Sequence, residues 1–124
     1  MQFAIDPFND GRDRTQFSLF RDSAGQCILY KASNYSTAEL PENITRRGII
    51  RDAKSVFVAT TEGWAMETRI PLREVYPLSG KEDAIGFEFV VNNGDGKTRT
   101  WQGWSGGIGD CKGPRHFGTL LRKK

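Results

Sequence analysis

Hydrophobic and polar residues alternate along most of the chain with the period of two that is typical of β-strands. In IGFEFVVNN, residues 85–93, this alternation places Ile85, Phe87, Phe89 and Val91 on one face. The same pattern predicts eight strands, over residues 2–6, 15–20, 26–32, 53–60, 64–70, 85–93, 97–104 and 117–124.

Clusters of Gly, Pro, Asn and Asp separate these segments and predict turns, at residues 6–13, 22–25, 62–63 and 92–96. Residues 33–50 have no steady period and predict a long loop, with or without short strands. Pro71 suits the first position of a single helical turn. Many short strands joined by turns predict an all-β fold, an antiparallel β-sandwich.

The composition agrees with one globular domain that spans residues 1–124. Hydrophobic residues make up 37% of the chain and charged residues 27%, as in ordinary globular proteins. The longest apolar runs contain only a few residues, so we expect no membrane span. The N-terminal residues show neither the basic region nor the apolar stretch of a signal peptide.

The net charge of +3 is a weak surplus that sits mainly at residues 46–47 and 122–124, so we expect no nucleic-acid partner. The two cysteines, Cys27 and Cys111, are too few for a structural zinc site. They could form a disulfide or remain two buried thiols, and the sequence leaves both open.

Catalytic chemistry finds little support in the sequence. The chain has a single histidine, His116, and no sequence pattern supplies it with the partners of a triad or a zinc site. Neighbouring acids such as Glu82 and Asp83 are not evidence for the two carboxylates that a glycosidase needs on opposite sides of a cleft. We therefore expect a protein that is not an enzyme.

Four oxygen-bearing side chains lie within the turn DPFNDGRD, and calcium binds oxygen ligands. The candidate calcium ligands are Asp6, Asn9, Asp10 and Asp13. Their spacing differs from that of the helix–loop–helix calcium loop. A solvated turn stabilised by Asn and Asp side chains is the interpretation that we favour over a calcium site.

Two tryptophans, Trp101 and Trp104, are three positions apart and would point to opposite faces of a regular strand. One would then be buried and the other exposed, close to polar residues that include Asn92 and Gln102. An exposed indole beside amide and guanidinium groups suits a sugar ring, which stacks on the indole while polar groups bind its hydroxyls. The alternative is that both indoles cap the end of the sandwich.

Four segments resemble the family 9 carbohydrate-binding modules in their order along the chain. They are WAMETRIPL (64–72), IGFEFVVNNGDG (85–96), the strand that carries Trp101, and FGTL (117–120). QFAIDPFNDGRD also resembles the family's strand that ends in an aspartate. The resemblance covers the C-terminal two-thirds of the family's domain and most of this chain.

The resemblance implies a β-sandwich of jelly-roll type, often with calcium, that binds glucan or xylan oligosaccharides between two tryptophans. Trp104 is the best match for the second of these, and Trp101 is a close alternative. Gln2 and Ser18 stand where the family has a glutamate and an arginine. The resemblance also implies an extracellular or cell-surface location.

The family's first tryptophan would precede Gln2, so we expect the sandwich to be incomplete within one chain. Open strand edges and an uncovered core would then favour self-association, or a partner that completes the sandwich.

Two alternatives to sugar binding remain open. One is a structural or protein-interaction sandwich whose sugar site has decayed. The other comes from related sandwich domains that bind haem through a Met and a His, for which this chain offers Met66 and His116.

Overall fold

The computed structural model describes residues 1–94, 97–109 and 113–123. In these ranges it has nine strands and two short 3-10 turns, without an α-helix. The strands are β1 (Gln2–Asp6), β2 (Arg14–Arg21), β3 (Cys27–Tyr35), β4 (Gly48–Ile49), β5 (Lys54–Thr60), β6 (Gly63–Arg69), β7 (Ala84–Gly94), β8 (Arg99–Gly103) and β9 (Gly118–Leu121). The turns are η1 (Leu72–Val75) and η2 (Pro114–His116).

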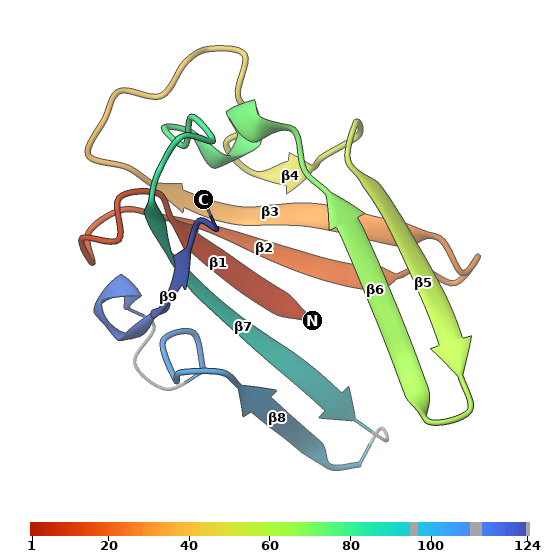
Figure 1. Ribbon diagram of the computed structural model, residues 1–124. Helices are drawn as coiled ribbons and strands as arrows, with labels where there is room; N and C mark the ends of the chain where they lie inside the picture. Colours follow the sequence, from red (N-terminus) through yellow and green to blue (C-terminus); the bar gives the residue numbers. More distant parts are fainter. Residues whose placement is uncertain (95–96, 110–112, 124) are drawn as a thin grey trace.

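The strands form two antiparallel sheets that pack against each other, which confirms the predicted all-β sandwich class (Figure 1). The large sheet has seven strands in the order β4-β3-β2-β1-β7-β8, and β9 also pairs with β7. The second sheet is the β5–β6 hairpin alone, which lies across one face of the large sheet. One layer of the sandwich is therefore much smaller than the other.

All eight predicted strands are present, and the two-residue strand β4 lies in the predicted long loop. The largest differences are at two C-terminal ends, because β3 continues to Tyr35 instead of ending at residue 32 and β9 already ends at Leu121. Pro71 precedes the predicted helical turn, η1. Residues 95–96 of the predicted turn 92–96 and residue 124 of the last predicted strand lie outside the described residues.

The core lies on the face of the large sheet that the hairpin partly covers. Alternation directs the buried side chains of Phe3, Phe17, Leu19 and Leu29 to this inner face, and their burial is worth about 1.5–3 kcal/mol each. The rings of Phe3 and Phe17 stack at a centroid distance of 5.1 Å. The opposite, outer face of the same strands carries mainly polar side chains.

A buried ion pair, Lys31–Glu74, joins β3 to η1. The Lys31 Nζ atom lies 3.0 Å from Oε2 of Glu74. The backbone N–H of Thr45 also donates to Glu74, at 3.1 Å, so the pair fixes part of the long loop. Burial lowers the pKa of Lys31, and the contact with Glu74 offsets part of that effect.

Candidate functional site

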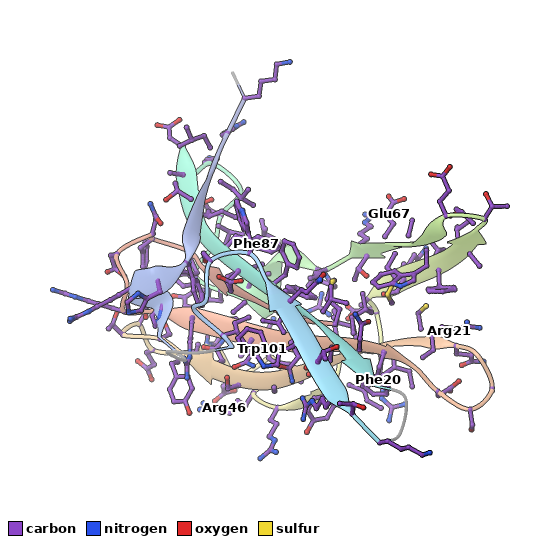
Figure 2. All side chains as sticks on the ribbon, turned by 90° about the horizontal axis from the view of Figure 1, so that it is seen from below. Phe20, Arg21, Arg46, Glu67, Phe87 and Trp101 are labelled. Atoms are coloured by element: carbon purple, nitrogen blue, oxygen red, sulfur yellow. The ribbon has the colours of Figure 1, made fainter. Side chains whose placement is uncertain are left out.

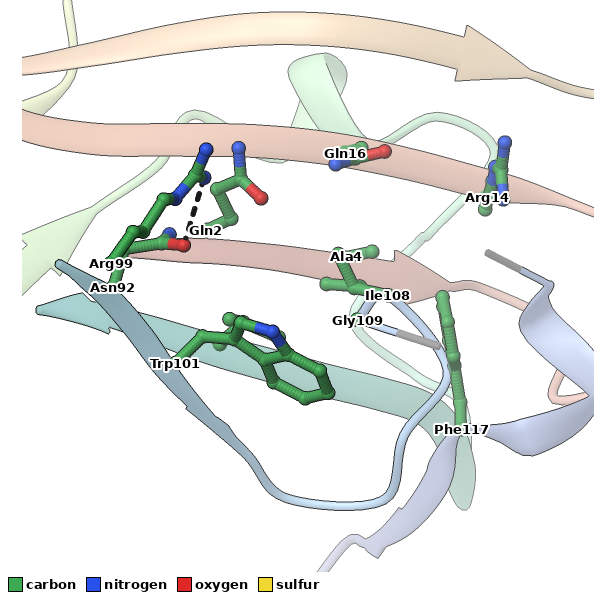
Figure 3. A pocket seen from close by; sticks show the side chains of 11 residues that line it. Gln2, Ala4, Arg14, Gln16, Asn92, Arg99, Trp101, Ile108, Gly109 and Phe117 are labelled. Atoms are coloured by element: carbon green, nitrogen blue, oxygen red, sulfur yellow. Dashed lines mark hydrogen bonds between the residues drawn. The ribbon is translucent and has the colours of Figure 1, made fainter. Parts of the chain in front are cut away.

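A cavity of about 590 Å³ opens on the outer face of the large sheet. Six side chains that line it offer an aromatic surface or hydrogen-bonding groups. They are Gln2, Arg14, Gln16, Asn92, Arg99 and Trp101. Ala4, Ile108 and Phe117 add apolar surface. In Figure 3 the indole of Trp101 forms one wall, and Arg14 and Arg99 stand at opposite ends.

Strand pairing gathers these residues from four strands that are distant in the sequence. Gln2 and Ala4 share a face of β1, and β1 pairs with β2 on one side and with β7 on the other. Asn92 on β7 lies directly opposite Trp101 on β8. Paired residues of an antiparallel sheet share a face, so this register places the amide of Asn92 beside the indole.

The Trp101 ring is held against the loop that follows β8. A Cβ atom built on Gly109 would lie only 2.6 Å from Cζ3 of the Trp101 ring. A Cβ built on Gly107 would lie 2.5 Å from Cδ1 of Phe117. These two glycines therefore allow the loop to pack closely against both aromatic walls of the cavity.

Glu88 anchors this loop from β7. Its carboxylate is buried and accepts the backbone N–H of Trp104 at 2.9 Å, of Ser105 at 2.9 Å and of Gly107 at 3.2 Å. The Ser105 hydroxyl also donates to Glu88. Burial acts to raise the pKa of Glu88, but these hydrogen bonds outweigh burial and hold the pKa below its ordinary value.

The polar groups of the cavity are partly preorganised. A terminal guanidinium nitrogen of Arg99 donates to Oδ1 of Asn92 at 3.0 Å, as the dashed line in Figure 3 shows. The guanidinium carbon of Arg14 lies 4.8 Å from the centroid of the Tyr35 ring. The amides of Gln2, Gln16 and Asn92 each combine donor and acceptor groups, which suits a ligand rich in hydroxyls.

The structure confirms that Trp101 and Trp104 belong to opposite faces. The expectation that one of them would be buried is wrong, because both are exposed: the inner face of the large sheet is only partly covered. Trp104 has its ring centroid 5.9 Å from that of Phe87 and 6.2 Å from that of Phe89, two residues of the inner face. In Figure 2, Phe87 and Trp101 lie on opposite sides of the large sheet. Trp101, rather than Trp104, is the tryptophan that lines the cavity.

Of the six predicted sugar-binding residues, the structure gathers Gln2, Asn92 and Trp101 around the cavity. Gln102 lies opposite Val91 on the inner face. Ser18 lies opposite Gln2 on the outer face but does not line the cavity.

Sequence reasoning missed several residues of the cavity, and Gln16 and Arg99 are the clearest examples. Gln16 alternates with buried Phe17, and this signal already placed Gln16 on the polar face. Arg99 is two positions before Trp101, so period-two alternation places both on one face. Ile108 and Phe117 had no comparable signal in the sequence. Ile108 reaches the cavity from the loop after β8, and Phe117 reaches it from the segment directly before β9.

In the predicted calcium-binding turn, the carboxylates of Asp6 and Asp10 accept backbone N–H groups of the turn itself. Asp6 accepts from Phe8 at 3.1 Å and from Gly11 at 2.8 Å. Asp10 accepts from Arg12 at 2.9 Å. Burial raises the pKa of Asp6, although the hydrogen bonds from the backbone of Gly11 and Phe8 oppose the shift. This geometry is that of a turn stabilised by Asp side chains.

The other two predicted ligands make contacts with more distant segments. Asp13 is buried and accepts the Thr37 hydroxyl at 3.0 Å, together with the Thr37 backbone N–H. Asn9 accepts the Thr119 hydroxyl through Oδ1 at 3.3 Å. Among residues 1–94, 97–109 and 113–123, no group of three or more His, Cys, Asp or Glu side chains is placed to hold a metal ion.

The pair considered for haem lies on separate elements. Met66 packs against the core from the inner face of the hairpin. His116 belongs to η2, and Figures 1 and 2 place the hairpin and η2 at opposite sides of the molecule. Cys111, one of the two cysteines for which the sequence leaves open a disulfide or two buried thiols, lies outside the described residues.

Comparison with known proteins found no matching family model, no matching curated protein and no matching solved structure. A search of the described residues also found no helix long and apolar enough to cross a membrane.

Proposed function

We propose that the protein binds carbohydrate without catalysing a reaction and that the outer-face cavity is the binding site. The observation that carries this proposal is the indole of Trp101 set beside three side-chain amides within one cavity. A volume of about 590 Å³ lies within the usual range of about 300–1,000 Å³ for small-molecule sites. Such a cavity accommodates one or two sugar units.

The proposed ligand is a glucan or xylan oligosaccharide. The apolar face of a sugar ring stacks on Trp101, and the amides of Gln2, Gln16 and Asn92 bind hydroxyl groups. The ligand class follows from the resemblance of the sequence to carbohydrate-binding modules, and so does the proposed extracellular or cell-surface location. Calcium binding at the turn of residues 6–13 stays the less favoured alternative to a solvated turn.

Isothermal titration with cellobiose, xylobiose and glucose tests the proposal, with calcium present and then with a chelator. We expect saturable binding that Trp101→Ala weakens at least about tenfold, as the loss of a stacking platform implies. The matched control is Trp104→Ala, which removes the tryptophan of the opposite face and is expected to retain binding. Absence of binding by the folded protein to all three sugars would contradict the proposal.

A second candidate function, protein interaction, rests on the incomplete cover of the inner face. The two-stranded hairpin faces a seven-stranded sheet, and large apolar side chains stay exposed around the gap between them. These include Trp64 and Trp104, and Leu120, which is 41% exposed and lies opposite the inner-face residue Ile85. We propose that a second copy of the chain, or a partner, covers this surface.

Sedimentation equilibrium between about 1 and 100 µM tests this second candidate, in the range where weak dimers separate from monomers. We expect a concentration-dependent dimer that Leu120→Glu shifts toward monomer, because Leu120 lies on the inner face opposite Ile85. Val58→Glu, on the outer side of the hairpin opposite Ala65, is the control because it adds the same single negative charge. A folded monomer over the whole range would exclude self-association and leave only a different partner.

A further inference from the structure

The charged side chains of the cavity are of one sign. Arg14 and Arg99 line it at opposite ends (Figure 3). Among the described residues, no Asp or Glu lines it. A site for a neutral sugar does not need two guanidinium groups, because amides already supply donors and acceptors. The charge of the cavity therefore points to a ligand that carries negative charge.

Two acidic side chains among the described residues lie on the same face of the sheet and make other contacts. Glu88 on β7 and Asp6 on β1 follow the same alternation as the cavity residues of their strands, and both are fully buried. Glu88 accepts hydrogen bonds from the loop after β8, and Asp6 accepts them from its own turn. Neither carboxylate lines the cavity, so neither supplies negative charge inside it.

A second hollow that is lined by arginines lies next to Phe117. This ring lines the cavity and also a neighbouring hollow of about 540 Å³, to which Arg12 and Arg115 contribute. Asp10 lines that hollow too, but its Oδ1 accepts the backbone N–H of Arg12. A Cβ built on Gly11 would lie 2.8 Å from Cγ of Arg115, so close packing against this glycine positions the arginine. The two hollows share Phe117 as a lining residue, and arginines line both of them.

We propose that the cavity selects acidic oligosaccharides, in which a sugar unit carries a carboxylate in place of its hydroxymethyl group. This inference rests on the proposed carbohydrate function and narrows its ligand class to uronate-containing chains. Arginine binds carboxylates through paired N–H donors in a planar fork. Arg99 gives one N–H to Asn92 and retains further donors for such a pair.

Cellobiose and cellobiouronic acid provide a matched pair of probes, because they differ only in the group at C6 of the non-reducing sugar. In isothermal titration we expect the uronate to bind at least about tenfold more tightly at low salt, as a charge-assisted contact implies. Between about 50 and 500 mM NaCl we expect this advantage to shrink, since salt screens charges at partly open sites.

Variants assign the effect to the cavity. Arg99→Gln is expected to remove most of the preference for the uronate, measured as the ratio of the two affinities in the same variant. The matched control is Arg21→Gln, because Arg21 stacks on Phe57 away from the cavity, at 4.6 Å from the ring centroid. It makes the same change in net charge and should leave the preference intact.

Each other outcome overturns a defined part of the inference. Equal or tighter binding of cellobiose would reject the acidic ligand and leave the carbohydrate function standing. Binding of neither probe would contradict the carbohydrate function as well. If sodium phosphate or citrate competed as strongly as cellobiouronic acid, the cavity would be a general anion site and the sugar part of the inference would be wrong.

Discussion

Trp101 and Trp104 expose almost the same fraction of their surface, 44% and 46%, but have different surroundings. Trp101 stands among amides and guanidinium groups in a cavity of the outer face. Trp104 contacts the rings of Phe87 and Phe89 on the inner face. The fraction exposed therefore does not identify a binding tryptophan, whereas the chemistry of its neighbours does. Substitutions around the two tryptophans should therefore differ in their effects on the free energy of unfolding and on sugar affinity.

The largest effect is expected from Glu88→Gln, because Glu88 holds the loop next to both tryptophans. The neutral amide weakens the charge-assisted hydrogen bonds and turns an NH2 group toward backbone donors. We expect the free energy of unfolding to fall by about 2–4 kcal/mol in urea denaturation. The control is Glu82→Gln, which alters a more exposed carboxylate that also accepts backbone N–H groups. An equal loss in both variants would contradict the anchoring role.

A smaller loss of stability should distinguish the two tryptophans. Trp104→Ala removes two aromatic contacts, and such pairs contribute about 0.5–1.5 kcal/mol beyond the burial of area. We therefore expect it to lower the free energy of unfolding by about 1 kcal/mol more than Trp101→Ala does. Thermal and urea denaturation of both variants measure the difference. The reverse order of stability would show that the cavity wall contributes more than the inner-face cluster.

Gly109→Ala and Gly118→Ala test the position of each ring without removing it. A Cβ added at Gly109 would meet the Trp101 ring at 2.6 Å, and a Cβ added at Gly118 would meet the Trp104 ring at 3.1 Å. We expect Gly109→Ala to weaken cellobiose binding by about three- to tenfold, because the Trp101 ring must shift. Gly118→Ala should change binding less than about twofold. Equal effects on titration would show that the position of Trp101 does not determine affinity.

The smallest effect is expected from acid titration of Glu88. Its pKa is lowered in the folded state, so its stabilising contribution is present above the unfolded value near 4.5. That contribution is lost as the pH falls from there through the folded pKa. Glu82 acts in the same direction: burial opposes the shift, but hydrogen bonds from Ser79 and Gly80 lower its pKa to about 2. The wild type should therefore lose stability more steeply below pH 4.5 than Glu88→Gln does. Parallel curves would contradict the prediction.

The sequence predicted the strands well because their alternation is local. Ile85, Phe87 and Phe89 share a face through their spacing alone, and the structure places all three against the core. The side chain of Lys31 was harder to place. Alternation with Leu29 puts Lys31 opposite Phe17 on the inner face, where its buried charge meets Glu74. That pairing depends on a contact between distant segments.

The candidate site was predictable only in part. Alternation required Trp101 and Trp104 to face opposite sides but did not say which side carries the cavity. The resemblance to carbohydrate-binding modules favoured Trp104, whereas the cavity is lined by Trp101. The choice depends on the loop after β8, whose Gly109 packs on Trp101 and whose position Glu88 fixes.

By itself, the sequence determined which elements form and which side chains share a face of each strand, because both follow from steric geometry over neighbouring residues. Only the tertiary structure decided which faces meet. Gln2 reaches Asn92 and Trp101 because β1 pairs with β7 and β7 pairs with β8. These pairings join residues far apart in the chain, and their register depends on burying one face of every strand at once. The cavity is a product of that collective packing.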